Sequence, residues 1–177
     1  MASIPNTDVV DWVLIELRDA PDAVSATPAT MIGRLAAFVS KDGSIVDMDG
    51  VSNPYFPHAP IPQLFVVIWH RNHLGIMSAY PLTEISGIYN YDFTTGADEA
   101  YGGANGHKEI GTGIWGMRGG DGNSDGDINN LDKNDIWLPD YGNTGYLNGD
   151  FNMDSQVLDD DKIDIWQPNS GKGTQVL

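Results

Sequence analysis

The chain of 177 residues has no cysteine and few basic side chains, and each shortage narrows the possible functions. Without cysteine, no disulfide can staple the fold and no thiol can act as a nucleophile or metal ligand. Nine Lys and Arg against 25 Asp and Glu give a formal net charge of −16. This charge argues against nucleic acid or an anionic membrane as a partner. No apolar run approaches the length of a membrane helix, so membrane insertion is not expected.

Nine of the 25 acidic residues lie in two stretches of twelve residues, whose starts are 29 residues apart. The first is DGNSDGDINNLD, residues 121–132, and the second is DFNMDSQVLDDD, residues 150–161. Both have oxygen-bearing side chains at positions 1, 3, 5 and 12, which is the ligand spacing of EF-hand calcium loops. Calcium is a hard cation with a flexible shell of oxygen ligands, and Asp and Asn supply such oxygens. The spacing therefore predicts two Ca²⁺ ions.

The predicted ligands are side-chain oxygens at positions 1, 3, 5 and 12 and the main-chain carbonyl at position 7. They are Asp121, Asn123, Asp125, the Asp127 carbonyl and Asp132 in the first loop, and Asp150, Asn152, Asp154, the Gln156 carbonyl and Asp161 in the second. Position 6 makes a sharp turn, where Gly126 is favourable and Ser155 carries a conformational cost. The alternative for either loop is an acidic, solvated turn without metal, since Asp, Asn and Gly are common in turns.

The repeat extends beyond the loops, which makes a chance match of both less credible. Six residues recur in register: Lys133, Asp135, Ile136, Trp137, Pro139 and Gly142 reappear as Lys162, Asp164, Ile165, Trp166, Pro168 and Gly171. We expect a short helix after each loop, limited by its proline. The two tryptophans are expected to pack each helix onto its neighbour or onto the preceding part of the chain.

Two loop–helix units in tandem, with Asp at position 12 and no helix before either loop, resemble a dockerin module. The resemblance covers residues 119–173 and implies two calcium-bound units related by a pseudo-twofold axis. It also implies docking onto a cohesin-like protein, with partner choice influenced by loop positions 10 and 11. These positions hold Asn130 and Leu131 in the first loop, and Asp159 and Asp160 in the second. Because the two pairs differ, a symmetric dual binding mode is not expected.

Residues 9–117 have the pattern of short strands separated by Gly, Pro, Asn and Asp. The expected strands are Val9–Arg18, Leu35–Val39 paired as a hairpin with Ile45–Met48, Leu64–Trp69, Leu74–Ala79, Tyr89–Thr94 and Ile110–Met117. Residues 23–34 allow a helix start, but Pro28 and the β-branched residues favour extended chain. This predicts a β-sandwich domain, residues 1–118, followed by a small α-helical dockerin-like domain, residues 119–177, with Gly119 and Gly120 as the hinge.

The first region also looks like a β-domain found immediately before dockerin-like repeats in large bacterial surface and secreted proteins. The residues that carry this likeness are DWVLIELR at 11–18, VIWHRNHLGIMS at 67–78 and YDFTT at 91–95. The likeness implies a location outside the cytoplasm, at the cell surface or extracellular, as an accessory C-terminal module. The first ten residues, MASIPNTDVV, do not have the pattern of a signal peptide, so we expect a piece of a larger exported protein.

No pattern in the chain predicts catalysis. His70 and His73 face opposite sides if they lie on a strand, so a hydrogen-bonded turn is favoured over a site. His107 lies in a Gly-rich stretch and is expected at the surface. The carboxylates available for glycosidase chemistry show no spacing that selects a pair. They are Glu16, Glu84, Asp98, Glu99 and Glu109. A G-x-S-x-G nucleophile motif is absent from the sequence.

The sequence therefore predicts a non-enzymatic calcium-binding module for adhesion or assembly. It would dock onto a cohesin-like protein or another domain of the same polypeptide, or it would rigidify the C-terminus. The first alternative is a carbohydrate-binding module with structural calcium repeats, using aromatic side chains as a platform for sugar rings. The candidates are Trp12, Trp69, Trp115, Tyr55, Phe56, Tyr89, Tyr91 and Tyr101, although aromatics in strands are more often core residues. The second alternative is a spacer that binds calcium only for rigidity.

Overall fold

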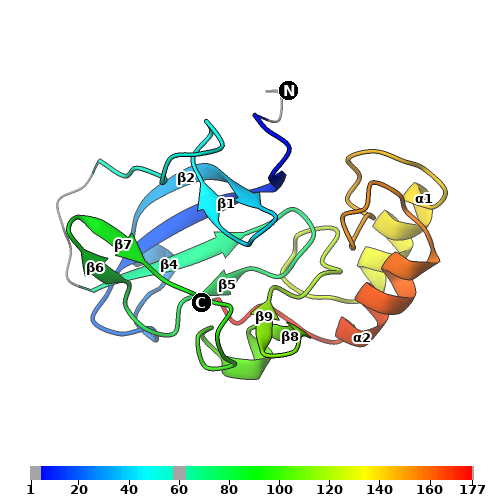
Figure 1. Cartoon of the computed structure of the whole chain (residues 1–177). Helices are drawn as coiled ribbons and strands as arrows, with labels where there is room; N and C mark the ends of the chain where they lie inside the picture. Colours follow the sequence, from blue (N-terminus) through cyan, green and yellow to red (C-terminus); the bar gives the residue numbers. More distant parts are fainter. Residues whose placement is uncertain (1–4, 58–62, 177) are drawn as a thin grey trace.

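The computed structural model describes residues 5–57 and 63–176, and most of its regular structure is β (Figure 1). Five strands form one antiparallel sheet in the order β3-β2-β1-β4-β5. Their bounds are Val9–Asp19 for β1, Met31–Ser40 for β2, Ile45–Val46 for β3, Leu64–Trp69 for β4 and Ile76–Met77 for β5. Two separate hairpins pair β6 (Thr83–Ile85) with β7 (Ile88–Asn90) and β8 (Lys108–Gly111) with β9 (Ile114–Gly116). The predicted mainly β class is confirmed, but these strands do not show two facing sheets.

The central strand β1 carries apolar side chains toward one core cluster. Val13, Ile15 and Leu17 are buried there with Val66 and Ile68 of β4. Alternation along the strand explains this, because every second side chain points to the same face. The expected strands at residues 9–18 and 64–69 are therefore confirmed. The predicted hairpin at residues 35–48 is present too, since β2 pairs with β3 in antiparallel register.

The opposite face of β1 holds a buried ion pair. Arg18 Nε lies 2.7 Å from Glu16 Oε1, and Arg34 Nη2 lies 2.7 Å from Glu16 Oε2. Burial alone would raise the pKa of Glu16, but the hydrogen bonds from Arg18 and Arg34 outweigh it and hold that pKa below its ordinary value. Glu16 is therefore an ionised structural residue, and it has the wrong protonation state for a general acid.

Some strand boundaries differ from the sequence prediction because local turns interrupt them. Residues 110–117 form most of the β8–β9 hairpin, whose turn includes Gly113 with a φ of +71°, rather than one strand. Residues 89–94 are strand only to Asn90. Residues 23–34, where the sequence allows either a helix start or extended chain, contain the short 3₁₀ helix η1 (Pro28–Thr30). Strand β2 begins directly after it. A second 3₁₀ helix, η2, spans Gly103–Asn105.

A short helix follows each acidic loop, as expected. The π-helical segment η3 (Asp132–Trp137) continues into α1 (Leu138–Asp140), and η4 (Asp161–Trp166) continues into α2 (Gln167–Asn169). Each helix runs one residue beyond its proline, further than predicted. Proline has no N–H and crowds the carbonyl four residues earlier, and the wider π turn accommodates this. No helix in the described ranges is long and apolar enough to cross a membrane.

The junction between the sheet region (residues 5–118) and the repeat region (residues 119–176) is buried. Gly119 pairs with His73 in an isolated β-bridge, and the Gly120 N–H donates to the Asn72 carbonyl at 2.9 Å. The two glycines expected to form a hinge therefore have a main chain that is packed and hydrogen-bonded. The chain end also returns to the sheet region (Figure 1): Thr174 Oγ1 donates to the Gly75 carbonyl at 2.8 Å.

Candidate metal centre

The carboxylate at position 1 of each loop accepts two main-chain hydrogen bonds from its own loop. Asp121 Oδ1 accepts from the Asp125 N–H and Oδ2 from the Gly126 N–H, both at 3.1 Å. In the second loop, Asp150 Oδ1 accepts from the Asp154 N–H at 3.1 Å and Oδ2 from the Ser155 N–H at 3.0 Å. The two loops thus wrap around the same carboxylate in the same way.

The carboxylate at position 12 closes each loop from the other end. Asp132 Oδ1 accepts from the Asn123 N–H at 3.3 Å and Oδ2 from the Asn129 N–H at 2.7 Å. The equivalent bonds to Asp161 come from the main-chain N–H groups of Asn152 at 3.0 Å and Leu158 at 2.8 Å. Positions 3, 9 and 12 are therefore brought together in both loops, although they are up to nine residues apart in sequence.

Among the predicted ligands at positions 3 and 5, Asn152 is half-buried, and the other three are exposed. Asn123 Oδ1 accepts from the Asp125 N–H at 3.1 Å, and Asn152 Oδ1 accepts from the Asp154 N–H at 2.9 Å. Asp125 and Asp154 each accept from the main-chain N–H at position 7, which belongs to Asp127 and Gln156. Both position-7 residues also form isolated β-bridges, Asp127 with Gly173 and Gln156 with Thr144.

Both loops contain left-handed backbone at positions 4 and 6. The sequence predicts this at position 6, where Gly126 has a φ of +89° and Ser155 a φ of +72°. The turn at position 4 was not predicted, because Ser124 and Met153 give no signal for φ values of +57° and +65°. A non-glycine residue in this conformation costs about 1–2 kcal/mol. The loops keep these conformations because the bonds to the buried carboxylates depend on them.

The carboxylates at positions 1 and 12 are almost fully buried. Their exposed fractions are 3% for Asp121, 0% for Asp132, 2% for Asp150 and 0% for Asp161. Burial, aided by the neighbouring carboxylates of Asp132 and Asp125, raises the pKa of Asp121 to about 6. Burial also raises the pKa of each of the other three. Packing such like charges together is unfavourable unless a cation offsets them.

The donor set fits a hard, oxygen-seeking cation. Among the described residues, no three His, Cys, Asp or Glu side chains form a metal-ligating group by themselves. A loop of this spacing does not require such a group, because amide, main-chain carbonyl and water oxygens complete the shell of Ca²⁺. Each loop brings two buried carboxylates, one exposed carboxylate and one amide to the same turn. Imidazole and thiolate, which suit zinc, are absent from both loops.

The two loop–helix units exchange main-chain hydrogen bonds at position 8. The Ile128 N–H donates to the Lys172 carbonyl, and the Gly171 N–H donates to the Ile128 carbonyl, both at 2.8 Å. In the other unit, the Val157 N–H donates to the Asn143 carbonyl at 3.0 Å, and the Gly142 N–H donates to the Val157 carbonyl at 2.9 Å. Each loop is therefore completed by the segment that follows the helix of the other unit.

The repeat-equivalent tryptophans make the same exchange with their side chains. Trp137 Nε1 donates to the Leu158 carbonyl at 2.9 Å, and Trp166 Nε1 donates to the Asn129 carbonyl at 3.0 Å. Both acceptors are at loop position 9. A lysine from the other unit lies over each ring: Lys162 Nζ is 4.3 Å from the Trp137 ring centroid. The prediction that these tryptophans pack the helices together is confirmed.

The residues at positions 10 and 11 have different surroundings in the two loops. Leu131 is 51% exposed, and Asn130 Oδ1 accepts from the nearby Lys133 side chain. Asp159 Oδ1 accepts from Lys162 Nζ at 2.8 Å, while Asp160 accepts from the Asn152 side chain at 3.1 Å. The second pair is thus engaged in local bonds, and the first pair exposes an apolar side chain. The asymmetry of the sequence persists in three dimensions.

The histidines of residues 70–73 lie in a turn, as predicted. The rings of His70 and His73 meet edge to face with centroids 4.7 Å apart, and His73 Nδ1 lies 2.8 Å from Asn72 Oδ1. His107 contradicts its prediction: it is fully buried beside the Trp115 ring rather than at the surface. A Gly-rich neighbourhood gave no sign of this packing, since the covering ring comes from β9.

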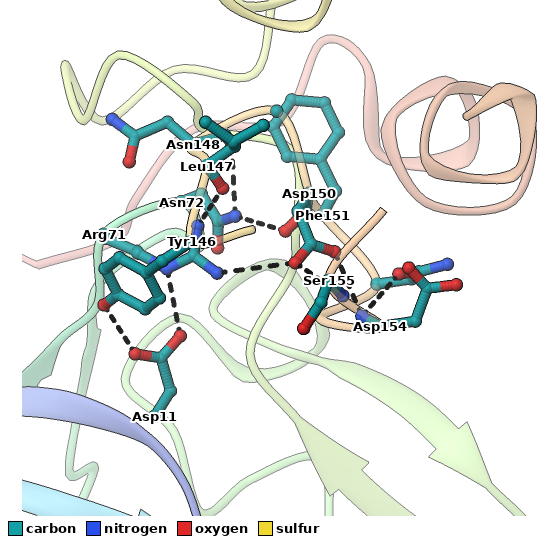
Figure 2. Close-up of polar contacts among 12 residues, drawn as sticks. Asp11, Arg71, Asn72, Tyr146, Leu147, Asn148, Asp150, Phe151, Asp154 and Ser155 are labelled. Carbon is teal, nitrogen blue, oxygen red and sulfur yellow. Dashed lines mark hydrogen bonds and ion pairs between the residues drawn. The ribbon is translucent and has the colours of Figure 1, made fainter. Parts of the chain in front are cut away.

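The sequence carries no signal for the polar network around Arg71 (Figure 2). Arg71 Nε lies 3.0 Å from Asp11 Oδ2, and the Tyr146 hydroxyl donates to Asp11 Oδ1 at 2.6 Å. The guanidinium also lies over the Tyr146 ring, 4.2 Å from its centroid. Asp11 is in β1 and Tyr146 joins the two loop–helix units, so this network ties the two regions together. No spacing rule links residues 135 positions apart.

The aromatic side chains considered for sugar stacking are partly engaged in the interior. Trp69 Nε1 donates to Glu16 Oε2 at 3.3 Å, and the Tyr91 hydroxyl donates to the Glu99 carbonyl at 2.5 Å. Trp115 packs against His107. Trp12 and Tyr55 remain 49% and 74% exposed. These contacts resemble ordinary core and turn packing of aromatic residues more than a row of exposed rings.

We expect His73 to make the stability of the chain depend on pH. Burial, with help from nearby His70 and Arg71, lowers the pKa of His73 to about 3. In the unfolded chain the pKa is about 6.5, so below that pH the unfolded state binds the extra proton and gains stability. Stability should therefore fall as the pH drops below about 6.5, with a slope of at most about 1.4 kcal/mol per pH unit from this group.

Urea unfolding at several pH values tests this expectation. The variant His73→Gln should show a flatter stability profile between about pH 4 and 6.5 than the wild type, since it has lost the titrating group. Saturating calcium in both samples keeps loop occupancy the same. Parallel profiles for the two proteins would contradict the expectation.

Comparison of the chain with protein-family models, curated proteins and solved structures finds no match.

Proposed function

We propose that this chain is a calcium-binding module in which each acidic loop holds one Ca²⁺ ion. The observation that carries the proposal is the repeat of the same hydrogen bonds, position by position, around carboxylates that are almost fully buried. Two independent acidic turns have no reason to share this arrangement. The proposed ligands are those predicted from the spacing, with Asp127 and Gln156 contributing main-chain carbonyls.

Calcium in this proposal is a source of folding energy. Two buried carboxylates in each loop repel one another, and a divalent cation would offset that repulsion. Because each loop pairs with the tail of the other unit, filling one loop also orders the partner unit. The exchange of bonds at position 8 and through the tryptophans supports a dockerin-like organisation with an approximate twofold relation.

For the sheet region, we propose that the sheet and the hairpins together form a curled sandwich. The hairpin β6–β7 takes the place of the second layer, since Tyr89 packs against the core cluster that contains Val13 and Ile15. Two buried carboxylates of the described part of this region, Glu16 and Asp11, are ion-paired with arginines, which suits a structural role. We therefore propose a non-enzymatic role, as an adhesion or assembly module of an exported protein.

The proposed module would dock onto a cohesin-like protein or another domain of the same polypeptide. The exposed positions 10 and 11 of the first loop, Asn130 and Leu131, are the proposed contact residues, and the locally bonded Asp159 and Asp160 contribute less. Binding of the holo protein to an immobilised cohesin would support docking. Failure to bind any cohesin in the presence of calcium would leave rigidification of the C-terminus as the role.

Native mass spectrometry combined with calcium calorimetry tests the metal proposal. The wild type should bind two Ca²⁺ ions, and Asp125→Ala or Asp154→Ala should each lose one, because both remove an exposed position-5 ligand without opening the core. Asp135→Ala and Asp164→Ala are matched controls, since these aspartates are repeat-equivalent and exposed but outside the loops. Binding of no calcium, or equal losses in the control variants, would overturn the proposal.

A further inference from the structure

One residue of the sheet region contacts position 1 of both loops. Asn72, in the turn after β4, is fully buried. Its main-chain carbonyl accepts from the N–H groups of Gly120 at 2.9 Å and Asp121 at 3.1 Å, at the start of the first loop. Its side-chain Nδ2 donates to the carbonyls of Asp150 at 2.7 Å and Asn148 at 3.2 Å, at the start of the second loop (Figure 2).

The neighbours of Asn72 hold this turn against the repeat region. The Arg71 carbonyl accepts from Ser124 Oγ at 2.7 Å, and Arg71 also donates to the Leu147 carbonyl. Arg71 Nη2 lies 3.9 Å from Asp150 Oδ2, near enough for electrostatic attraction. On the other side, Leu74 is buried in the core cluster of the repeat region with Ile128. Residues 71–74 therefore act structurally as part of the repeats.

The side chain of Asn72 has a defined orientation. Its Nδ2 donates to the carbonyls of Asp150 and Asn148, at and just before the start of the second loop. Its Oδ1 lies 2.8 Å from His73 Nδ1. A buried amide with its donors and acceptor engaged is locked, and rotating it would leave buried carbonyls unpaired. The main chain at Asp150 is consequently held by a group from outside the loop. Residues that orient metal ligands from outside the metal shell affect metal affinity strongly.

We propose that Asn72 is a positioning residue of the calcium centre and that the sheet region is thereby a part of it. The proposal rests on the proposed calcium function. The two loops depend on Asn72 differently: the first uses its main chain, which any substitution keeps, and the second uses its side chain. Loss of the side-chain amide therefore weakens the second site selectively, whereas a general loss of stability weakens both sites.

The variant Asn72→Leu tests this, because leucine has a similar size and no hydrogen-bonding group. Calcium is titrated into the full-length ¹⁵N-labelled chain and followed by NMR. The Gly126 amide reports on the first loop and the Ser155 amide on the second, since each donates to its own position-1 carboxylate. The expected result is an affinity about 10–100-fold lower at the second loop and a clearly smaller loss at the first, which pairs with the second unit. Asn90→Leu is the control, because the Asn90 side chain is exposed and donates to the Ile88 carbonyl within its own hairpin.

The outcomes separate this inference from the proposed function. Wild-type affinity at the second loop of Asn72→Leu, or an equal loss at both loops, would overturn the role of Asn72 while calcium binding stands. Absence of calcium binding in the wild type would overturn the proposed function itself. Should Asn72→Leu not fold, the wild type provides a second measurement. Calcium should slow hydrogen exchange of the Asn72 side-chain amide, and an unchanged exchange rate would overturn the inference.

Discussion

Removal of calcium with EDTA should lower the melting temperature of the whole chain by about 20 °C. At a thousandfold excess over its Kd, an ion that binds only the folded state contributes about 4 kcal/mol, and two ions contribute about 8 kcal/mol. For a chain of this size, each kcal/mol corresponds to about 2–4 °C. The physical source is the repulsion among the buried carboxylates of Asp121, Asp132, Asp150 and Asp161, which the cations offset.

Differential scanning calorimetry with and without EDTA measures this effect. The double variant Asp125→Ala/Asp154→Ala is the control, and its melting temperature should respond little to chelation. A single transition is expected in the presence of calcium, because the Tyr146–Asp11 and Thr174–Gly75 bonds join the two regions. A wild-type profile that chelation leaves unchanged would contradict the calcium proposal. Two well-separated transitions in the holo protein would instead show that the regions unfold independently.

The second large effect is expected at Glu16. Replacing it with Gln keeps its shape but removes the charge that Arg18 and Arg34 pair with. Glu16 and Arg18 have side chains that are 0% and 1% exposed, so in the variant the buried guanidinium of Arg18 would lose the negative charge that now lies 2.7 Å from its Nε. Breaking a buried pair in this way typically costs about 3–5 kcal/mol. Glu16→Gln should therefore unfold at a clearly lower urea concentration than the wild type.

Equilibrium urea unfolding at saturating calcium provides the measurement. Glu84→Gln is a matched control at an exposed carboxylate and should change stability by less than about 0.5 kcal/mol. The double variant Glu16→Leu/Arg18→Met should recover much of the loss, since it removes both buried charges, while Arg34, whose side chain is 50% exposed, stays solvated. Near-wild-type stability of Glu16→Gln would mean that this ion pair contributes little to the fold.

The loops show how far local sequence can determine structure. The hydrogen bonds to the carboxylates of Asp121 and Asp132 come from main-chain groups of the same twelve residues, and the same holds for the equivalent bonds in the second loop. The spacing of the proposed calcium ligands can therefore be recognised in the sequence, because it reflects a turn that is closed by residues close together in the chain. The strands at residues 9–19 and 64–69 can also be recognised locally, since they are rich in the apolar, β-branched and aromatic side chains typical of a buried sheet.

Contacts between distant segments could not be predicted in this way. His107 is expected at the surface from its Gly-rich neighbours, yet the Trp115 ring covers it. The hinge expected at Gly119 and Gly120 is closed because Asn72, nearly fifty residues earlier in the sequence, accepts from the Gly120 N–H. A conformationally permissive glycine pair permits motion, but packing decides whether motion occurs.

The sequence by itself determined which residues present oxygen atoms at calcium-loop spacing, that this pattern occurs twice, and that the remainder is mainly β. Only the tertiary structure decided that the loops complete each other and that the sheet region joins them through Asn72. The physical reason is the range of the interactions. Loop turns are closed by neighbours in sequence, whereas the bond from Asn72 to Asp150 joins residues 78 positions apart and exists only once the chain has folded.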